Sequence, residues 1–154
     1  MSDDHRIEIT IDAPPSAVYD AIATGDGVRA WWTEDARVAE EVGGVSRMTF
    51  GREHWTEMRV DRLVPGEEVG WACVDQYQAS FEEPDEWVGT TISFRLEPED
   101  GGERTRLHFV HSGLEPLDCA EICRRGWDHY IRGSLRSLLE SGAGTPSVDW
   151  ATSA

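Results

Sequence analysis

Residues 119–141 read CAEICRRGWDHYIRGSLRSLLES and predict one long amphipathic helix. One stripe of this helix is mainly apolar and contains Cys119, Cys123, Trp127, Tyr130 or Ile131, Ser134 or Leu135, and Leu138. The opposite stripe is polar and contains Arg125, Asp128, His129, Arg132, Arg136 and Glu140. The helix therefore has one face suited to lie on an apolar surface.

Local signals mark both ends of this helix. Asp118 is the expected N-cap and Glu121 the third helical residue, as in a capping box, while Leu117 is placed to pack on Ile122. Gly142 is expected to end the helix. At 1.5 Å per residue the helix is about 35 Å long, which is enough to cross several strands.

The chain before the helix alternates between apolar and polar residues, which is typical of strands. A first strand is expected over residues 7–12, followed by two short helices near residues 15–24 and 27–32. Further strands are predicted over residues 36–40, 45–50, 55–63, 68–74, 88–97 and 105–111. Because the turns between them are mostly short, the strands should pair antiparallel. The predicted fold class is α+β: a curved antiparallel sheet of about seven strands, with the long C-terminal helix packed across it above a pocket.

Chain length and net charge indicate the number of domains and disfavour some classes of partner. The 154 residues fit one domain, expected over residues 1–146 and followed by a flexible tail over 147–154. Thirty acidic against 14 basic residues give a net charge of -16, which disfavours nucleic acid and anionic membranes as partners. All the basic residues are arginine, which fits either a GC-rich coding sequence or a salt-adapted host. Without an apolar span or signal peptide, the expected location is cytoplasmic.

Several short motifs follow one another along the chain. They are Ala13-Pro14, Trp31-Trp32, Gly43-Gly44, Trp87 with Gly89-Thr90, Ile92-Ser93-Phe94, residues 109–114, and, in the helix, Gly126-Trp127, Tyr130-Ile131 and Ser134-Leu135. With these motifs the chain resembles the START-like superfamily known as SRPBCC, and more specifically its heat-shock-protein-90 ATPase activator-like branch. The resemblance covers residues 6–146. It implies a helix-grip fold whose cavity often holds a hydrophobic small molecule, and it supplies no catalytic motif.

Half of the aromatic residues are tryptophan, with 7 Trp beside 3 Tyr and 4 Phe. A tryptophan ring offers a large apolar area and one N–H donor, which suits the wall of a ligand cavity. The residues expected to bind a ligand are Trp55, Trp71, Trp87, Phe94, Phe109, His111, Trp127 and Tyr130. The alternative is that these rings simply fill the core of a wide sheet.

Two titratable residues are candidates for chemistry. His111 ends the last strand, where it would act as a general base with Tyr130 as proton donor, or serve as a structural residue that ties the strand end to the following turn. Glu57 is a buried acid if its face of the strand points inward. If Met58 and Val60 point inward instead, Glu57 faces solvent.

The three cysteines do not form a recognised metal motif. Cys119 and Cys123 are four residues apart, so both thiols share the inward face of the helix start. A zinc site would have to recruit His111 and Cys73, which no short spacing connects to the pair. We therefore expect buried, unreactive thiols, no metal and no cofactor.

Three functions fit this pattern. The first is a non-enzymatic domain that binds a small hydrophobic or amphipathic molecule, since no nucleophile elbow, phosphate loop or dinucleotide fingerprint is present. The second is a cyclase- or dehydratase-like enzyme that uses His111. The third, implied by the resemblance, is a chaperone-interacting protein. A homodimer through residues 75–86 or a sheet edge also remains open.

Overall fold

The computed structural model describes residues 4–50, 54–78, 85–114, 116–117 and 120–146. Seven strands form one sheet: β1 (His5–Ile11), β2 (Asp35–Arg37), β3 (Val45–Thr49), β4 (His54–Val64), β5 (Glu68–Gln78), β6 (Thr91–Glu99) and β7 (Arg104–Ser112). All neighbours pair antiparallel in the order β1-β7-β6-β5-β4-β3-β2, so β1 and β2 are the edges. The predicted α+β fold is confirmed.

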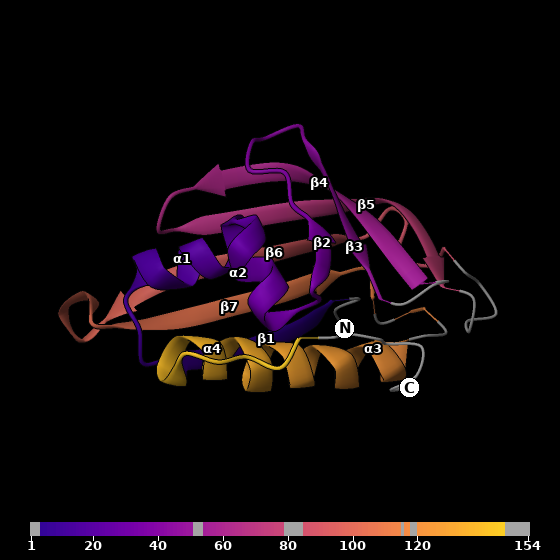
Figure 1. Ribbon diagram of the computed structural model, residues 1–154. Helices are drawn as coiled ribbons and strands as arrows, with labels where there is room; N and C mark the ends of the chain where they lie inside the picture. Colours follow the sequence, from indigo (N-terminus) through magenta and orange to yellow (C-terminus); the bar gives the residue numbers. More distant parts are fainter. Residues whose placement is uncertain (1–3, 51–53, 79–84, 115, 118–119, 147–154) are drawn as a thin grey trace.

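The helices lie on one face of this sheet (Figure 1). They are α1 (Pro15–Ala23), α2 (Gly25–Trp31) and the C-terminal helix; a short turn of 3-10 helix, η1 (Asp100–Gly102), joins β6 to β7. Pro15 opens α1, where a missing N–H costs no helical bond. The Thr24 hydroxyl accepts from the backbone N–H of Gly27 and so caps α2. These two helices carry the Trp31-Trp32 pair over the sheet.

The C-terminal helix runs without interruption through three segments: α3 (Ala120–Trp127), η2 (Asp128–Leu135) and α4 (Arg136–Ser141). It ends as predicted at Gly142, whose φ of 89° is left-handed and whose N–H reaches the carbonyl of Leu138. The expected N-cap, Asp118, and Cys119 lie outside the described residues.

The middle segment η2 is a π-helix, in which each turn holds more residues than an α-helical turn. An α-helical pattern leaves either Tyr130 or Ile131, and either Ser134 or Leu135, on the apolar stripe. All four are buried in the structure. The wider turns therefore place both members of each pair against the rest of the fold.

Strand β5 continues four residues beyond its predicted end at Val74. A register shift opposite Glu57 and Met58 leaves both Val74 and Asp75 on the outer surface. This β-bulge breaks the alternation, so the prediction that the strand ends at Val74 is wrong. Beyond the bulge the inward positions are Gln76 and Gln78. Strand β6 begins at Thr91 rather than 88, because residues 85–89 form turns.

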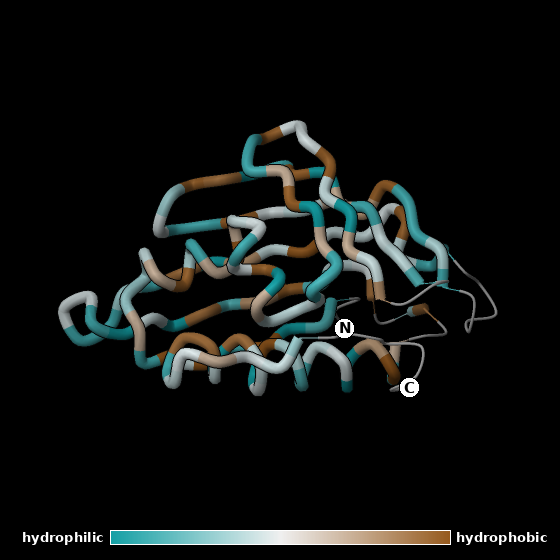
Figure 2. The backbone as a smooth tube through the Cα atoms, in the orientation of Figure 1, coloured by the Kyte–Doolittle hydropathy of each residue, from teal (hydrophilic) through white to brown (hydrophobic). Residues whose placement is uncertain are grey.

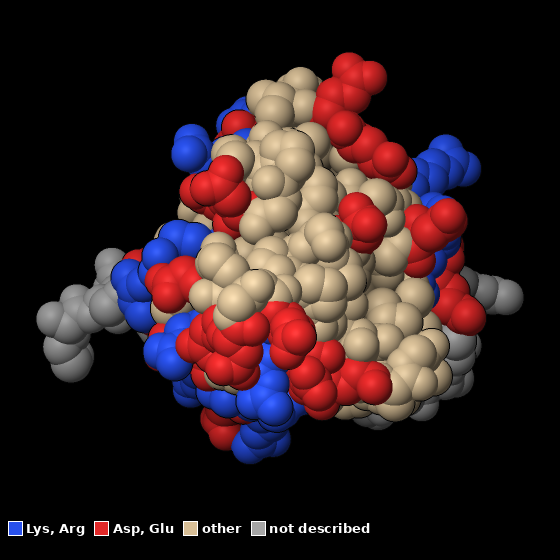
Figure 3. All heavy atoms as spheres, turned by 90° about the vertical axis from the view of Figure 1, so that its left-hand side faces the viewer, with Lys and Arg blue, Asp and Glu red and all other residues tan. Residues whose placement is uncertain are grey.

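Apolar residues gather on the inner side of the strands and helices (Figure 2). Acidic side chains surround an uncharged central area on the face shown in Figure 3.

Within the part of the chain that the structure describes, none of the helices has the length and apolar character needed to cross a membrane.

Candidate ligand-binding pocket

A small pocket of about 70 Å³ lies between the C-terminal helix and the end of β5. Its wall draws on five parts of the chain. The lining residues are Trp32, Phe50, Gln76, Gln78, Trp87, Ile122, Cys123, Gly126, Trp127 and Tyr130. Ile122 is 55% exposed, so the pocket meets the surface on the side of α3. Of the predicted ligand-binding residues, the structure places Trp87, Trp127 and Tyr130 on this wall.

Aromatic rings make up much of the wall and hold one another in place. Trp87 stacks on Trp127, with ring centroids 5.8 Å apart and planes 16° from parallel. Trp127 also contacts Trp32, which in turn meets Phe50 edge to face at 5.5 Å. Such ring pairs add stability beyond the area that they bury. The wall is therefore rigid and mainly apolar.

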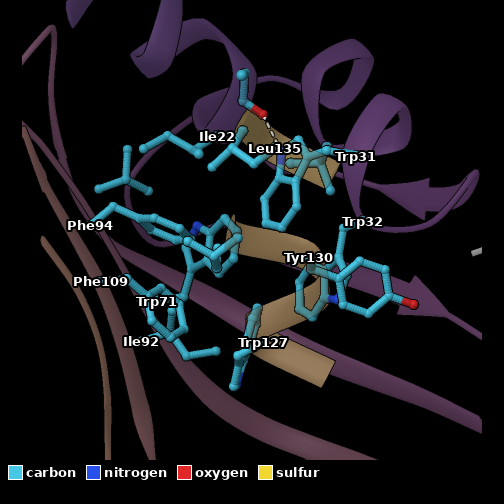
Figure 4. Packing of buried hydrophobic residues seen from close by; sticks show 14 of the residues in the cluster. Ile22, Trp31, Trp32, Trp71, Ile92, Phe94, Phe109, Trp127, Tyr130 and Leu135 are labelled. Carbon is cyan, nitrogen blue, oxygen red and sulfur yellow. Dashed lines mark hydrogen bonds between the residues drawn. The ribbon is translucent and has the colours of Figure 1, made fainter. Parts of the chain in front are cut away.

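Beside the pocket, the space between helix and sheet is filled by aromatic side chains (Figure 4). Trp71 stacks on Trp32 at 5.8 Å and meets Phe94 edge to face at 5.2 Å. Phe94 in turn packs on Phe109 at 5.3 Å. Trp71, Phe94 and Phe109 therefore belong to the packed core rather than to the pocket wall, as in the alternative interpretation of the tryptophan content. The expected gap beneath the helix is reduced to one small pocket.

Trp55 lies on the outer face of the sheet, so the prediction that it lines the cavity is wrong. In β4 the buried positions are 54, 56, 58 and 60, which turns residues 55 and 57 outward. The guanidinium of Arg47 lies 4.1 Å from the centre of the Trp55 ring, a cation–π contact. Glu57 forms an ion pair with the same Arg47 at 3.3 Å. Glu57 is thus on the outer face, and Met58 and Val60 point inward.

His111 is fully buried and has a hydrogen-bond partner at each ring nitrogen. The indole N–H of Trp127 donates to Nδ1 at 3.0 Å, so Nδ1 carries no proton. Nε2 lies 2.9 Å from the Thr90 hydroxyl oxygen, and the Thr90 O–H donates to the carbonyl of Trp87 at 2.6 Å. In the neutral ring the proton is therefore on Nε2, and the chain of bonds runs from Trp127 to Trp87. Burial, with a smaller effect from His5, lowers the pKa of His111 to about 3.

This arrangement gives His111 a positioning role. It orients the Trp127 ring through Nδ1 and the Thr90 hydroxyl through Nε2, and it is not among the residues on the pocket wall. Tyr130 does line the pocket, with its ring packed edge to face on His129 at 4.9 Å. The structure therefore does not bring His111 and Tyr130 together as an acid–base pair on that wall.

Two glutamines form a polar part of the wall that the sequence analysis missed. The Gln76 side-chain carbonyl accepts from the backbone N–H of Trp87 at 2.9 Å. Its amide nitrogen is buried and has no hydrogen-bond partner among the described residues. The Gln78 side-chain oxygen pairs with Nδ1 of His54 at 2.8 Å. Gln76 and Gln78 are two residues apart, which is the spacing of side chains on one face of a strand. The bulge before them breaks the alternation of β5, so this spacing alone did not show that they point inward.

The described cysteines are buried thiols. Cys123 lines the pocket and lies 3.4 Å from the indole nitrogen of Trp87, which donates to the sulfur. Cys73 lies behind the wall, 3.4 Å from the Thr56 hydroxyl. Burial raises the pKa of the Cys73 thiol to about 11, so this group stays protonated at neutral pH.

The seven-stranded antiparallel sheet and the long helix across it define a domain of the START-like, SRPBCC type. The chain belongs to the family described as Activator of Hsp90 ATPase homolog 1-like protein, whose model matches residues 12–140. No curated protein matches the sequence.

Solved structures agree with this assignment. The chain is similar to the Aha1 dimer from Colwellia psychrerythraea, solved in solution, with 32% identity, 92% of this chain and 98% of that chain covered, and a TM-score of 0.76. A crystal structure from Chromobacterium violaceum shares 23% identity over 90% of this chain and 97% of that chain, with a TM-score of 0.71. A protein of the dynemicin biosynthetic locus shares 18% identity over 94% of this chain and 49% of that chain, with a TM-score of 0.70. The last two likenesses show the fold alone.

Proposed function

We propose that this domain binds a compact, mainly apolar molecule in the pocket beside Trp87 and Trp127. The observation that carries the proposal is the pocket itself, where aromatic rings from separate parts of the chain meet around a space that reaches the surface near Ile122. Apolar walls with a few polar groups are the usual character of small-molecule sites.

The size of the pocket limits the ligand. At about 70 Å³ it is smaller than the roughly 300–1,000 Å³ of sites for drug-sized ligands. It is about half of the roughly 150 Å³ engineered cavity that holds benzene. Because the pocket is open on one side, part of a ligand can extend past Ile122 to the surface, so a single ring with one small substituent is the largest class of molecule that it suits.

The surroundings of His111 favour binding over catalysis. A general base must offer a free lone pair to the group that it deprotonates. The Nδ1 lone pair of His111 is taken by the Trp127 N–H, and the Nε2 atom is engaged with Thr90. An enzyme that relies on His111 would have to break this buried chain of hydrogen bonds before each turnover.

A matched pair of helix variants tests the proposal. Gly126 lines the pocket, and a Cβ built on it meets nothing within 4 Å, so Gly126→Leu should fold and fill the space. Gly133 has the same open surroundings on the same helix and does not line the pocket. Ligand-observed NMR with toluene, α-methylstyrene and acetophenone should detect binding to the wild type and to Gly133→Leu. Binding to Gly126→Leu should fall at least tenfold; equal binding to both variants, or none to the wild type, would refute the proposal.

Self-association is a second candidate property, supported by the dimer described for the Colwellia relative. The edge strands β1 and β2 offer unpaired backbone groups to another copy. Light scattering coupled to size exclusion should then give twice the chain mass of 17.2 kDa. A single-chain mass across micromolar concentrations would exclude a stable dimer.

Action on a heat-shock-protein-90 chaperone is a second candidate function, supported by the description of the family. It predicts that the purified domain raises the ATPase rate of a bacterial heat-shock-protein-90 homologue in proportion to the amount added. An unchanged rate at saturating domain would count against this function and would leave the ligand-binding proposal intact.

A further inference from the structure

We infer that the ligand is a neutral carbonyl compound whose oxygen accepts a hydrogen bond from the side-chain amide of Gln76. The inference rests on the proposed function and adds the chemical class of the ligand. The structural basis is Gln76, a residue that lines the pocket and whose buried amide nitrogen lacks a hydrogen-bond partner within the described chain.

The orientation of the Gln76 amide is fixed by the backbone. Its oxygen accepts from the N–H of Trp87 at 2.9 Å, and a backbone N–H can only donate. The remaining atom of the Gln76 side-chain amide is therefore its NH₂ nitrogen, a donor. The Gln76 residue is only 3% exposed. A buried donor without an acceptor is unfavourable, and buried polar groups in proteins usually have a partner.

Several polar atoms nearby already have hydrogen-bond partners. The Gln78 oxygen pairs with His54, and Thr90 is held between His111 and the carbonyl of Trp87. The contrast with Gln76 singles out its amide nitrogen as the donor to be satisfied. A ligand atom that meets it must be a hydrogen-bond acceptor.

The charge of the protein favours a neutral hydrogen-bond acceptor on the ligand over a negatively charged one. The whole chain carries a net charge of -16, which repels a carboxylate or phosphate ligand. The apolar walls oppose such a ligand too, because they cannot solvate an ion. A ketone, aldehyde or amide oxygen accepts without carrying charge.

The rings around the pocket favour a flat molecule. Trp87 and Trp127 lie 16° from parallel, and planar groups stack well on such faces. A carbonyl conjugated to one aromatic ring meets the requirements of size, shape, charge and polarity together.

Two ligands of nearly equal shape test the inference. Acetophenone carries a C=O where α-methylstyrene carries a C=CH₂, so they differ chiefly in the acceptor. The wild type should bind acetophenone about tenfold more tightly, the usual effect of one hydrogen bond to a buried donor. Benzoate should bind more weakly than acetophenone.

The Gln76→Met variant removes the donor and keeps a side chain of similar length. Its acetophenone-to-α-methylstyrene affinity ratio should fall to about one. In wild-type protein labelled with ¹⁵N, the side-chain amide signal that Gln76→Met lacks should shift with acetophenone and not with α-methylstyrene.

The possible failures are distinguishable. Equal wild-type affinities for the two ligands, or tighter binding of benzoate, would overturn the carbonyl inference while the proposed binding function stands. An absence of binding by every probe would refute both. The wild-type ratio decides the carbonyl class without any variant. An unchanged ratio in a folded Gln76→Met protein would overturn the assignment of the donor to Gln76.

Discussion

Trp127 donates its indole N–H to Nδ1 of His111, and 3.0 Å separates the two nitrogens. The bond joins the pocket-lining face of the C-terminal helix to the inner face of β7. It also fixes the protonation of the histidine, since a proton on Nδ1 would face another donor. The last strand and the long helix are thus connected by a polar contact inside an apolar core, and its strength depends on pH.

Acid should destabilise the fold through His111. Its pKa is about 3 in the folded chain and about 6.5 when unfolded, so between these values only the unfolded chain binds the proton. The free energy of unfolding therefore falls as pH drops below about 6.5, by up to ~1.4 kcal/mol per pH unit, until pH approaches 3. Urea unfolding of the wild type and of His111→Gln at pH 7, 6 and 5 should give a flatter pH dependence in the variant. His129→Gln, on the exposed side of the helix, should follow the wild type, and parallel curves for wild type and His111→Gln would contradict this account.

Substitution of glycine by alanine should stabilise the protein inside the C-terminal helix and destabilise it at the helix end. Gly126 and Gly133 lie inside the helix with open space at the Cβ position, so Gly→Ala at either should stabilise by about 0.5–1 kcal/mol. Gly142 has a φ of 89°, where alanine is strained, so Gly142→Ala should destabilise by about 1 kcal/mol. Thermal unfolding of the three variants checks the order; a gain at Gly142 would be inconsistent with the left-handed helix end.

Loss of the Ser134 hydroxyl should weaken the contact between the C-terminal helix and α2. The hydroxyl donates to the carbonyl of Trp31 at 2.7 Å and accepts from the N–H of Thr145 at 2.7 Å. Ser134→Ala leaves both groups without this partner and should cost about 1–3 kcal/mol in chemical unfolding. Ser141→Ala, whose hydroxyl bonds are exposed, is the control and should change stability by less than about 0.5 kcal/mol. An equal loss of stability in Ser134→Ala and Ser141→Ala would show that the Ser134 hydroxyl does not hold the helix against α2.

Trp55 should be irrelevant to ligand binding. It packs under Arg47 on the outer face of the sheet, with the sheet between it and the pocket. Trp55→Ala should leave the affinity for acetophenone within about twofold of wild type, whereas Trp127→Ala should lower it at least tenfold, since a wall of the pocket is removed. Titration by ligand-observed NMR measures both, and a loss of affinity in Trp55→Ala would place the ligand on the opposite face.

Much of this fold follows from local patterns in the sequence. Alternating isoleucines predict β1, and Gly142 marks the end of the last helix because only a residue tolerant of positive φ ends it in this way. The short turns predict antiparallel pairing, and the resemblance to the SRPBCC superfamily predicts the packing of helix on sheet. The first strand, the turns and the helix end depend on neighbouring residues, which a single sequence displays directly.

The pocket was harder to predict, because it depends on departures from regular geometry. The bulge at Val74 moves Gln76 and Gln78 inward, and a strict period of two would not reveal it. Trp55 has the residue type of a pocket wall, yet the register of β4 turns it outward. Trp71 faces inward as expected, but whether it borders a cavity is decided by how its neighbours pack.

The bulge gives this scaffold an adjustable interior. Deleting one residue just before the bulge, with the bulge kept, would slip the end of β5 by one position, turn Tyr77 toward the helix, and send both glutamines to solvent. Over evolution, a single codon gained or lost at that point would exchange an amide-lined recess for a phenol-lined one without altering the connectivity of the strands. Insertions and deletions near this strand end, more than point substitutions, are therefore an efficient route by which such domains change what they recognise.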